Sequence, residues 1–350
     1  MWSFRKDKLE KLHLPAPTVW MLESLAEYKG KEELYTVQAP QLLQRLRETA
    51  IIQSAESSNR IEGVTVDRER LRPLVLGNTA PRDRSEEEVA GYRAALDLIH
   101  RDPAALSVTP DLILRLHAVA QGGMSGDAGE WKKRPNDIIE IAPDGRRTVR
   151  FSPLAPALVP AAVAELCDAY GDLMTAGRTS PLVAAAAFVL DFLCIHPFRD
   201  GNGRVSRLAT LLLSYQGGYG VGRYISIERI VEETKESYYA ALKASSDGWH
   251  TGEHDLLPWA NYLFSTLRTA YREFGERAHS ATTPRGSKSE QIEAALEAMP
   301  ALFSMSEMER ACPNASREMI RIVMRRWKEA GRIVSTGRGR DARWKKNGAV

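Results

Sequence analysis

The chain has 350 residues, of which 43% are hydrophobic and 27% charged, and these values are ordinary for a soluble globular protein. Its three cysteines are far apart and odd in number, which argues against a disulfide framework and predicts a reducing compartment. No cluster of cysteine and histidine has the spacing of a zinc site.

Targeting and membrane signals are absent from the pattern of the sequence. Residues 1–14 are charged and lack an apolar stretch, so we expect no signal peptide. The longest apolar run, 182–195, contains Asp191 and is too short to span a bilayer. We therefore predict a cytoplasmic protein that does not contact a membrane.

The formal net charge of +3 is unevenly distributed along the chain. Residues 285–350 carry 14 Lys and Arg against 8 Asp and Glu, whereas the remaining 284 residues carry 34 against 37. The sequence thus predicts a mildly acidic body followed by a basic C-terminal unit.

Residues 1–84 are predicted to form an N-terminal helical region. A short helix fits residues 17–28 and would end at Gly30. A stronger helix fits about 41–62, because apolar residues recur there at steps of three and four and Gly63 stands where a C-terminal cap belongs.

The end of this second helix is more polar than a core helix requires. Ser58 and Glu62 lie four residues apart and therefore share one helix face. The simplest interpretation is a solvated helix end, and a functional one depends on residues further along the chain.

A helical core is predicted over residues 85–278. Ser85 and Glu88 have the spacing of a capping box at its first helix. His117, in the following helix, is either a packed core histidine or part of a site. One β-hairpin is predicted at about 137–151, where two β-branched runs flank a Pro-Asp-Gly turn.

The residues with the most chemical potential form one run, His196 to Arg207, which reads His-Pro-Phe-Arg-Asp-Gly-Asn-Gly-Arg-Val-Ser-Arg. Pro197 should end the apolar helix that precedes it. Gly201 and Gly203 free the backbone, and apolar residues at helical spacing then predict a helix over residues 204–216. A helix N-terminus that follows glycines is an anion-binding site.

The side chains of this run suit phosphate chemistry. Arg204 and Arg207 are three residues apart and can reach the same anion. Asp200 offers a hard oxygen ligand for Mg²⁺, and His196 offers a neutral base. Each feature alone is common in turns and helix ends, but their combination at this spacing predicts phosphoryl or nucleotidyl transfer.

The run resembles the signature of the Fic (filamentation induced by cyclic AMP) family, H-x-F-x-[DE]-G-N-G-R-x-x-R, at every defined position. The resemblance covers about residues 40–275 and implies a mainly α fold, a helical bundle core with a small β-hairpin. It implies a protein adenylyltransferase that transfers AMP from ATP to a Ser, Thr or Tyr hydroxyl of a target protein or of itself, with Mg²⁺. In this chain it assigns His196 as general base, Phe198 as a core residue that fixes the loop and Asp200 as the Mg²⁺ ligand. The phosphates of ATP would be bound by Gly201, Asn202, Gly203, Arg204 and Arg207.

Two further stretches are similar to Fic sequences. Ser58–Gly63 resembles the inhibitory motif [ST]-x-x-x-E-[GN], which implies that Glu62 pairs bidentately with Arg207 and blocks productive binding of ATP. Tyr238 and Tyr239 resemble a tyrosine pair that lies near the adenine, although a core role for them is equally open.

The predicted hairpin at about 137–151 occupies the place of the Fic flap, which clamps the backbone of the target by strand addition. Ile138, Ile139 and Glu140 would then be flap residues. The family commonly has a Pro-Pro pair after the flap, whereas this chain has Ser-Pro-Leu-Ala-Pro at 152–156, so the register of the flap stays open.

Residues 279–288 are predicted to be a linker to a winged-helix-like unit at 289–350. Three helices precede two short strands that flank Gly337–Arg340. On the third helix Arg317, Arg321 and Arg325 form one basic stripe, which favours DNA contact or, equally, docking to a protein with the charges merely solvated.

The prediction is therefore an autoinhibited protein adenylyltransferase, with a C-terminal winged helix-turn-helix, that forms a homodimer. Two alternatives stay open. One is a nucleotide-sensing, DNA-binding regulator with little turnover. The other is transfer or removal of another phosphate-linked group by the same site.

Overall fold

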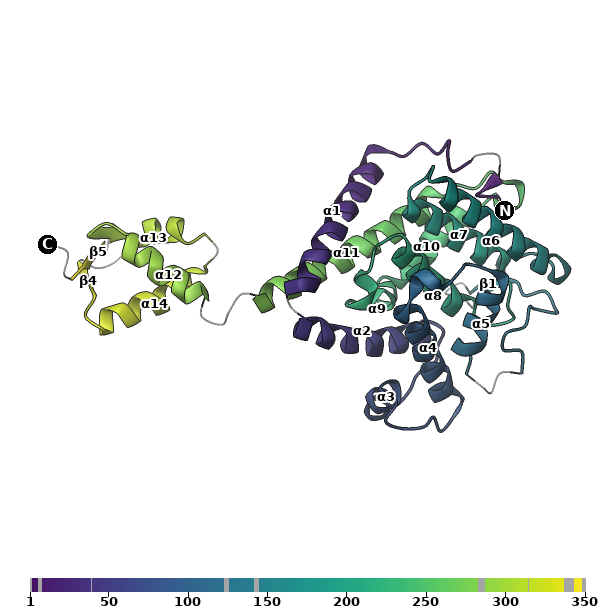
Figure 1. Ribbon diagram of the computed structural model, residues 1–350, viewed down its shortest axis with the longest axis horizontal. Helices are drawn as coiled ribbons and strands as arrows, with labels where there is room; N and C mark the ends of the chain where they lie inside the picture. Colours follow the sequence, from purple (N-terminus) through teal and green to yellow (C-terminus); the bar gives the residue numbers. More distant parts are fainter. Residues whose placement is uncertain are drawn as a thin grey trace. The chain divides into compact units, whose positions relative to one another are not determined.

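The computed structural model, shown in Figure 1, is mainly helical with two small antiparallel sheets. The residues that it describes are 2–5, 8–38, 40–122, 126–141, 145–282, 287–313, 315–336 and 343–347. The chain divides into two compact units, Met1–Glu276 and Arg277–Val350. Of the helices within the described ranges, none is long and apolar enough to cross a membrane.

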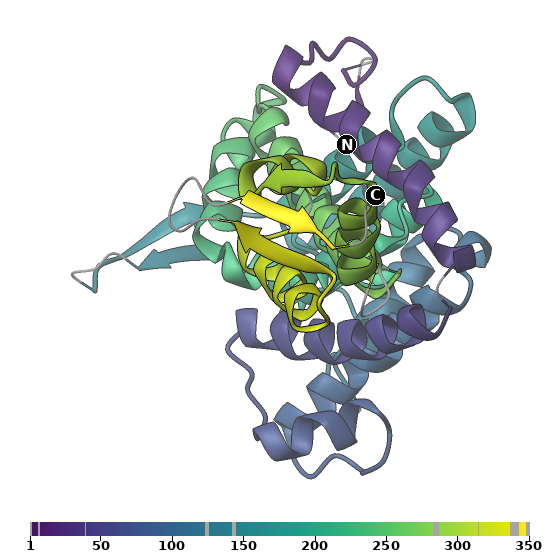
Figure 2. The same cartoon turned by 90° about the vertical axis from the view of Figure 1, so that its left-hand side faces the viewer.

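The first unit is a bundle of helices with one hairpin. Its helices are α1 (Ala16–Gln38), α2 (Pro40–Ile61), α3 (Arg68–Val75), α4 (Arg84–Arg101), α5 (Pro110–Ala120), α6 (Val159–Ala176), α7 (Pro181–Ile195), α8 (Asn202–Gln216), α9 (Ile227–Glu233), α10 (Lys235–Ser246) and α11 (Leu257–Thr282). Strands β1 (Ile138–Ile141) and β2 (Arg147–Phe151) form the predicted hairpin, which projects from the helical body in Figure 2. The Pro-Asp part of its predicted turn lies outside the described residues.

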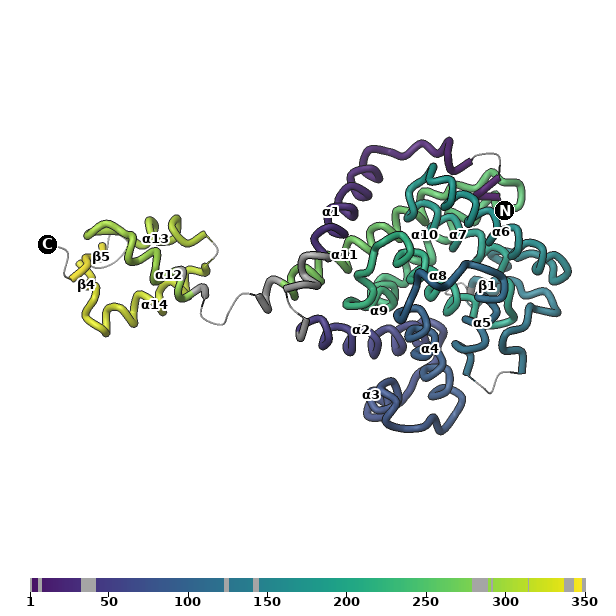
Figure 3. Tube along the Cα trace, in the orientation of Figure 1, coloured from purple at the N-terminus to yellow at the C-terminus, as the bar shows by residue number. Residues whose placement is uncertain are grey.

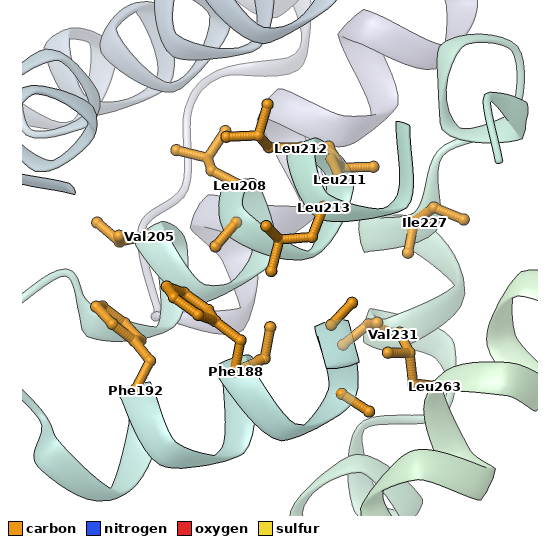
Figure 4. Close-up of a cluster of buried hydrophobic side chains, with 14 of the residues drawn as sticks. Phe188, Phe192, Val205, Leu208, Leu211, Leu212, Leu213, Ile227, Val231 and Leu263 are labelled. Atoms are coloured by element: carbon orange, nitrogen blue, oxygen red, sulfur yellow. The ribbon is translucent and has the colours of Figure 1, made fainter. Parts of the chain in front are cut away.

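Helix α7 lies at the centre of this unit because its sequence is apolar on every side, and nearly all of its side chains are buried. Helix α8 packs along it, and Figure 4 shows Phe188 and Phe192 of α7 beside Val205 of α8. Burying an aromatic side chain of this size stabilises the fold by about 1.5–3 kcal/mol. The two helices that flank the His196 loop are thus packed against each other through buried side chains.

Asp191 is the one acidic residue of α7, and it is fully buried. Its carboxylate accepts hydrogen bonds from Trp249 Nε1 at 2.6 Å, from the Ser3 hydroxyl at 2.8 Å and from the Ser3 backbone N–H at 3.1 Å. Burial raises the pKa of Asp191, and these donors oppose that shift. The interruption in the apolar run therefore anchors the N-terminal segment to the core.

Three predicted helix boundaries were wrong. Helix α1 continues through Gly30 to Gln38, since Gly30 does not adopt the left-handed conformation of a cap. Helix α11 continues to Thr282, so the first residues of the predicted linker 279–288 are helical, and residues 283–286 lie outside the described part. Helix α4 begins at Arg84 and is capped by Asp83, whose side chain accepts from the Glu86 N–H.

In its described residues the second unit contains three helices and a three-stranded antiparallel sheet, which Figure 3 traces from α12 to β5. Its elements are α12 (Ser287–Ala298), β3 (Leu302–Ser304), α13 (Met305–Ala311), α14 (Arg317–Glu329), β4 (Ile333–Thr336) and β5 (Arg343–Lys346). The strand order is β3-β5-β4. Strand β3 was not predicted, because three residues carry no recognisable alternation. The predicted turn Gly337–Arg340 lies outside the described residues.

Candidate active site

The loop between α7 and α8 is fixed by its own sequence. His196 ends α7 in the left-handed conformation (φ 50°), and Gly201 precedes α8 with φ 78°. Helix α8 begins at Asn202, two residues earlier than predicted, so Gly203 lies in its first turn. The Asn202 side chain accepts from the Phe198 N–H at 2.9 Å and donates to the Phe198 carbonyl at 2.8 Å. Asn202 therefore braces the loop with its side chain.

Phe198 and His117 hold the loop from behind. Phe198 is fully buried and stacks on the His117 ring, with 3.7 Å between the ring centroids. His117 accepts from the Gly129 N–H at Nδ1 and so donates from Nε2 to the Asp200 carbonyl at 3.1 Å. His117 is thus a packed core histidine that supports the loop from α5.

His196 is in the protonation state that a general base needs. Its Nδ1 lies 3.2 Å from the Leu193 carbonyl, which can only accept, so Nδ1 carries the proton and Nε2 has a free lone pair. Burial lowers the pKa of His196 to about 4, and the positive charges of Lys132 and Arg150 lower it as well, whereas Leu193 and Glu62 act in the opposite direction. The ring is therefore neutral at pH 7.

A carboxylate occupies the N-terminus of α8. A Cβ atom placed on Gly203 would overlap Glu62 Oε1, so a larger residue at this position would displace the carboxylate. The Glu62 carboxylate is an anion at a helix N-terminus, where backbone N–H groups and the helix dipole favour negative charge. It stands where a phosphate group would be expected to bind.

Arg207 is buried, and residues at the end of α2 accept from its Nε and Nη2. Its Nη2 donates to Glu62 Oε1 at 2.7 Å and to the Ser58 carbonyl at 2.9 Å, and its Nε donates to the Ser58 hydroxyl at 2.8 Å. The structure thus contains the ion pair expected between Glu62 and Arg207. The expected bidentate geometry was wrong, because only Oε1 of Glu62 accepts from Arg207, at Nη2, and Ser58 accepts from Nη2 and Nε.

Arg204 is also buried, with 1% of its surface exposed, and it faces a carboxylate that the sequence did not indicate. Its Nη1 donates to Glu88 Oε2 at 2.7 Å and its Nη2 to Gln121 Oε1 at 3.1 Å. The predicted capping box of Ser85 and Glu88 was therefore wrong, since Glu88 neutralises Arg204. Arg204 braces the loop in this state.

The Asp200 carboxylate is a suitable ligand for Mg²⁺. Its side chain is 57% exposed, and Oδ1 accepts from the Gly201 N–H at 2.7 Å. Oδ2 lies 3.5 Å from Arg204 Nη2. Within the described ranges no group of three His, Cys, Asp or Glu could hold a metal by itself. A single carboxylate fits Mg²⁺, which is usually held by one or two carboxylates together with substrate phosphates.

A cavity of about 290 Å³ is lined both by His196 and by Gly203 and Arg207 near the N-terminus of α8. Its walls come from α2, the hairpin, α7, the loop, α8 and α10, and they are Glu62, Asp137, Ile138, Arg150, Phe151, Leu190, Leu193, Cys194, His196, Gly203, Arg207, Tyr238, Tyr239, Leu242 and Ser246. Asp200 is not among them. An apolar floor with a base and a guanidinium is suited to a small ligand that carries phosphate.

Comparison with known proteins decides the family. The model of the Fic/DOC family matches residues 107–214. A Fido domain-containing protein of Dictyostelium discoideum is 32% identical over 121 residues, which are 35% of this chain and 80% of that protein. The chain belongs to the Fic/DOC family.

Other relatives of this Fic protein are more distant. The protein adenylyltransferase fic-1 of Caenorhabditis briggsae is 28% identical over 211 residues, which are 58% of this chain and 37% of that protein. The protein of the same name from Caenorhabditis elegans is 26% identical over 254 residues, 67% of this chain and 45% of that protein. The chain thus spans less than half of the length of these two relatives.

The fold is that of solved Fic proteins. A Fic family protein from Desulfovibrio desulfuricans superimposes with a TM-score of 0.62 at 22% identity, covering 97% of this chain and 98% of that chain. A Fic domain-containing signaling protein from Bacteroides thetaiotaomicron gives 0.61 at 23% identity, covering 73% of this chain and 98% of that chain.

The two tyrosines of the Fic core differ in their surroundings. Tyr238 is buried and packs edge-on against Trp259, which is the behaviour of a core residue. Tyr239 is 38% exposed and closes one side of the cavity. Both line the cavity, and the exposed ring of Tyr239 is more accessible to an adenine ring than the buried ring of Tyr238.

The hairpin of the Fic core borders the same cavity. Ile138 is a lining residue, whereas Ile139 is 47% exposed and Glu140 pairs with Lys243 of α10 at 2.7 Å. One edge of β1 is therefore close to the base. The sequence did not predict that Glu88 pairs with Arg204 or that Arg150 lines the cavity, because the only indication of either residue was its charge.

Proposed function

We propose that this chain is a protein adenylyltransferase, which transfers AMP from ATP to a Ser, Thr or Tyr hydroxyl of a protein. The observation that carries the proposal is that neutral His196, with Nε2 free, lines the same cavity as Gly203 and Arg207. The names of the relatives from two Caenorhabditis species support the same reaction.

The reaction is a displacement at the α-phosphorus. The hydroxyl oxygen forms a bond to this phosphorus, the bond from the α-phosphorus to the oxygen bridging to the β-phosphate breaks, and pyrophosphate leaves. His196 Nε2 takes the hydroxyl proton. The N-terminus of α8 and Arg207 would hold the phosphates and offset the charge that develops. Asp200 would hold Mg²⁺, which neutralises phosphate charge.

We further propose that α2 inhibits the enzyme. Glu62 uses the N-terminus of α8 and Arg207 at the same time, so a phosphate and this carboxylate compete for one place. Ser58 holds Arg207 in the paired position. The same Glu62 could orient water for removal of AMP, which is the alternative reaction of this site.

The reaction is tested by the chemical identity of the adduct. The full chain, incubated with Mg²⁺, a cell lysate and ATP labelled in the α-phosphate, should transfer label to protein, and ATP labelled in the γ-phosphate should not. Mass measurement of a modified peptide should give the mass of one AMP on a hydroxyl residue. Label from the γ-phosphate alone, or an adduct of another mass, would replace AMP transfer with a different phosphate chemistry.

A second function is proposed for the C-terminal unit, namely DNA binding by a winged helix. Helix α14 buries Ile320, Val323 and Trp327, so its outer face is left with arginines. Arg325 is exposed and has no ion-pair partner among the described residues, whereas Arg321 lies 3.7 Å from Glu318. Arg317 is paired with Glu309 at 2.9 Å, so it is the least available member of the predicted stripe. Exposed arginines on a helix, such as Arg321 and Arg325, suit phosphate contacts and the major groove.

The DNA proposal is tested with Arg321→Gln/Arg325→Gln in the full chain. If both arginines contact phosphates, the slope of log K against log salt should fall by about 2, since each contact contributes about 0.9. Arg178→Gln, which removes an exposed arginine of the first unit, is the matched control. A full chain that retains no DNA at low salt would favour protein docking instead. The homodimer and the cytoplasmic location stay predictions.

A further inference from the structure

The flap hairpin contains a β-bulge beside the active-site cavity. Ile138 pairs with Phe151 and Ile139 pairs with Val149, so Arg150 has no partner on β1. A bulge turns the side chain of the extra residue out of the regular alternation, and bulges are frequent next to active sites. The bulge therefore accounts for an arginine at a position that would otherwise follow the strand pattern.

Arg150 faces the cavity that contains the base. It is a lining residue together with His196 and Tyr239. Its Nε is shielded from solvent and has no hydrogen-bond partner among the described residues. A buried donor without a partner costs about 1–3 kcal/mol, and native structures nearly always satisfy such groups. Arg204 Nε likewise has no partner within the described ranges, so this atom alone does not identify a ligand; what distinguishes Arg150 is that it lines the cavity.

The other arginines of the site are already neutralised. Arg204 pairs with Glu88 at 2.7 Å, and Arg207 pairs with Glu62 at 2.7 Å. Arg150 has no carboxylate within ion-pair distance in the described part of the chain, although Asp137 lines the same cavity. Arg150 is therefore available to an anion even when the Glu62 carboxylate occupies the N-terminus of α8.

We propose that Arg150 binds the α-phosphate of the nucleotide and stabilises the negative charge that develops on its oxygens during transfer. This inference rests on the proposed adenylyl transfer. The α-phosphorus must lie one hydroxyl group away from His196, and Arg150 lines the same cavity as His196. Arg207 and Gly203, by contrast, would bind the β- and γ-phosphates of ATP. A guanidinium suits this task because its donors match the geometry of two phosphate oxygens.

Because Arg150 lies on the flap, binding of the target protein to the flap would affect its position. A target segment that adds to β1 would lie one strand away from the bulge. Strand addition by the target would then hold β1, and Arg150 beside it, against the α-phosphate, so that charge stabilisation is complete only when an acceptor is present.

The test uses the full-length Glu62→Gly protein as the active background and compares Arg150→Gln with Arg147→Gln. Arg147 lies on the same strand, is exposed and does not line the cavity, so it is the matched control. For Arg150→Gln we expect kcat of AMP transfer to fall by about 10²-fold, as for the loss of one donor to a developing oxyanion. We also expect weaker binding of AMP and unchanged binding of adenosine. Arg150→Lys, which keeps the charge but not the fork, should recover part of kcat.

Binding of AMP and adenosine separates this proposal from the proposed function. If the Glu62→Gly protein forms no AMP adduct, adenylyl transfer is wrong, but the ratio of the two affinities still reports on Arg150. If Arg150→Gln binds AMP and adenosine as the parent protein does and retains its kcat, the proposal is overturned. Equal loss of AMP and adenosine binding would also overturn it, because that result indicates a collapsed cavity and not a lost phosphate contact.

Discussion

Replacing His196 with alanine or asparagine should abolish AMP transfer while leaving the affinity for ATP nearly unchanged. A positioned general base contributes about 10²–10⁴-fold to the rate. His196 lines the cavity with a free ring nitrogen, and within the described residues its ring makes one hydrogen bond, to the Leu193 carbonyl, so removal of the ring disturbs few contacts. The rate is measured with α-labelled ATP, and the affinity for ATP by calorimetry.

Two variants are needed because His196 has φ 50°, a region that alanine adopts with strain of roughly 1–2 kcal/mol. Asparagine tolerates this conformation better, and its side-chain amide cannot act as a general base. If both variants lose the rate and keep the thermal midpoint, the imidazole is the base. A variant that still transfers AMP at the parent rate would remove His196 from this role.

The pH profile gives an independent reading of the same group. The base acts when it is neutral, and burial lowers the pKa of His196 to about 4. The rate should therefore not fall between pH 8 and pH 6, where an ordinary histidine becomes protonated. Glu62 raises this pKa, so its removal in an active variant should extend the plateau to still lower pH. A midpoint near 6.5 would mean that the ring is exposed in the working enzyme.

Local sequence signals predicted the scaffold of the site well. Pro197 follows the end of α7, and Gly201 precedes the start of α8. Both effects are local, because proline lacks a backbone N–H and glycine allows a positive φ. The spacing of Ser58 and Glu62 placed both on one helix face, and both contact Arg207. Such features depend on residues within one or two turns, which is the range over which sequence periodicity carries information.

The contacts that local patterns could not supply are between distant segments. Glu88 lies 116 residues before Arg204, and its spacing from Ser85 supported a capping box that does not form. The bulge at Arg150 depends on the pairing of two strands, which alternation within each strand does not specify. Buried charge pairs and strand register are consequences of packing, and a single sequence leaves their partners open.

The Glu62→Gly variant should transfer AMP, to itself and to targets, faster than the parent protein. The ion pair from Glu62 Oε1 to Arg207 Nη2 is 2.7 Å long and the arginine side chain is 6% exposed, so it is little screened by solvent. A hydrogen bond to a charged group contributes about 1.5–3 kcal/mol. Its loss should favour phosphate over the inhibited state by roughly 10- to 100-fold, since 1.4 kcal/mol is a factor of ten. Incorporation of label from α-labelled ATP measures the change.

Glu56→Gly is the matched control for this variant. Glu56 lies in α2, which ends just before Glu62, and it pairs with exposed Arg60, so its replacement loosens α2 by about 1 kcal/mol without changing the N-terminus of α8. Activation by Glu62→Gly but not by Glu56→Gly assigns inhibition to the carboxylate, and Glu62→Gln should then activate as well, because an amide keeps the shape but loses the charge. If neither change at Glu62 raises the rate, the carboxylate at the N-terminus of α8 only braces Arg207, and α2 is a structural support for the site.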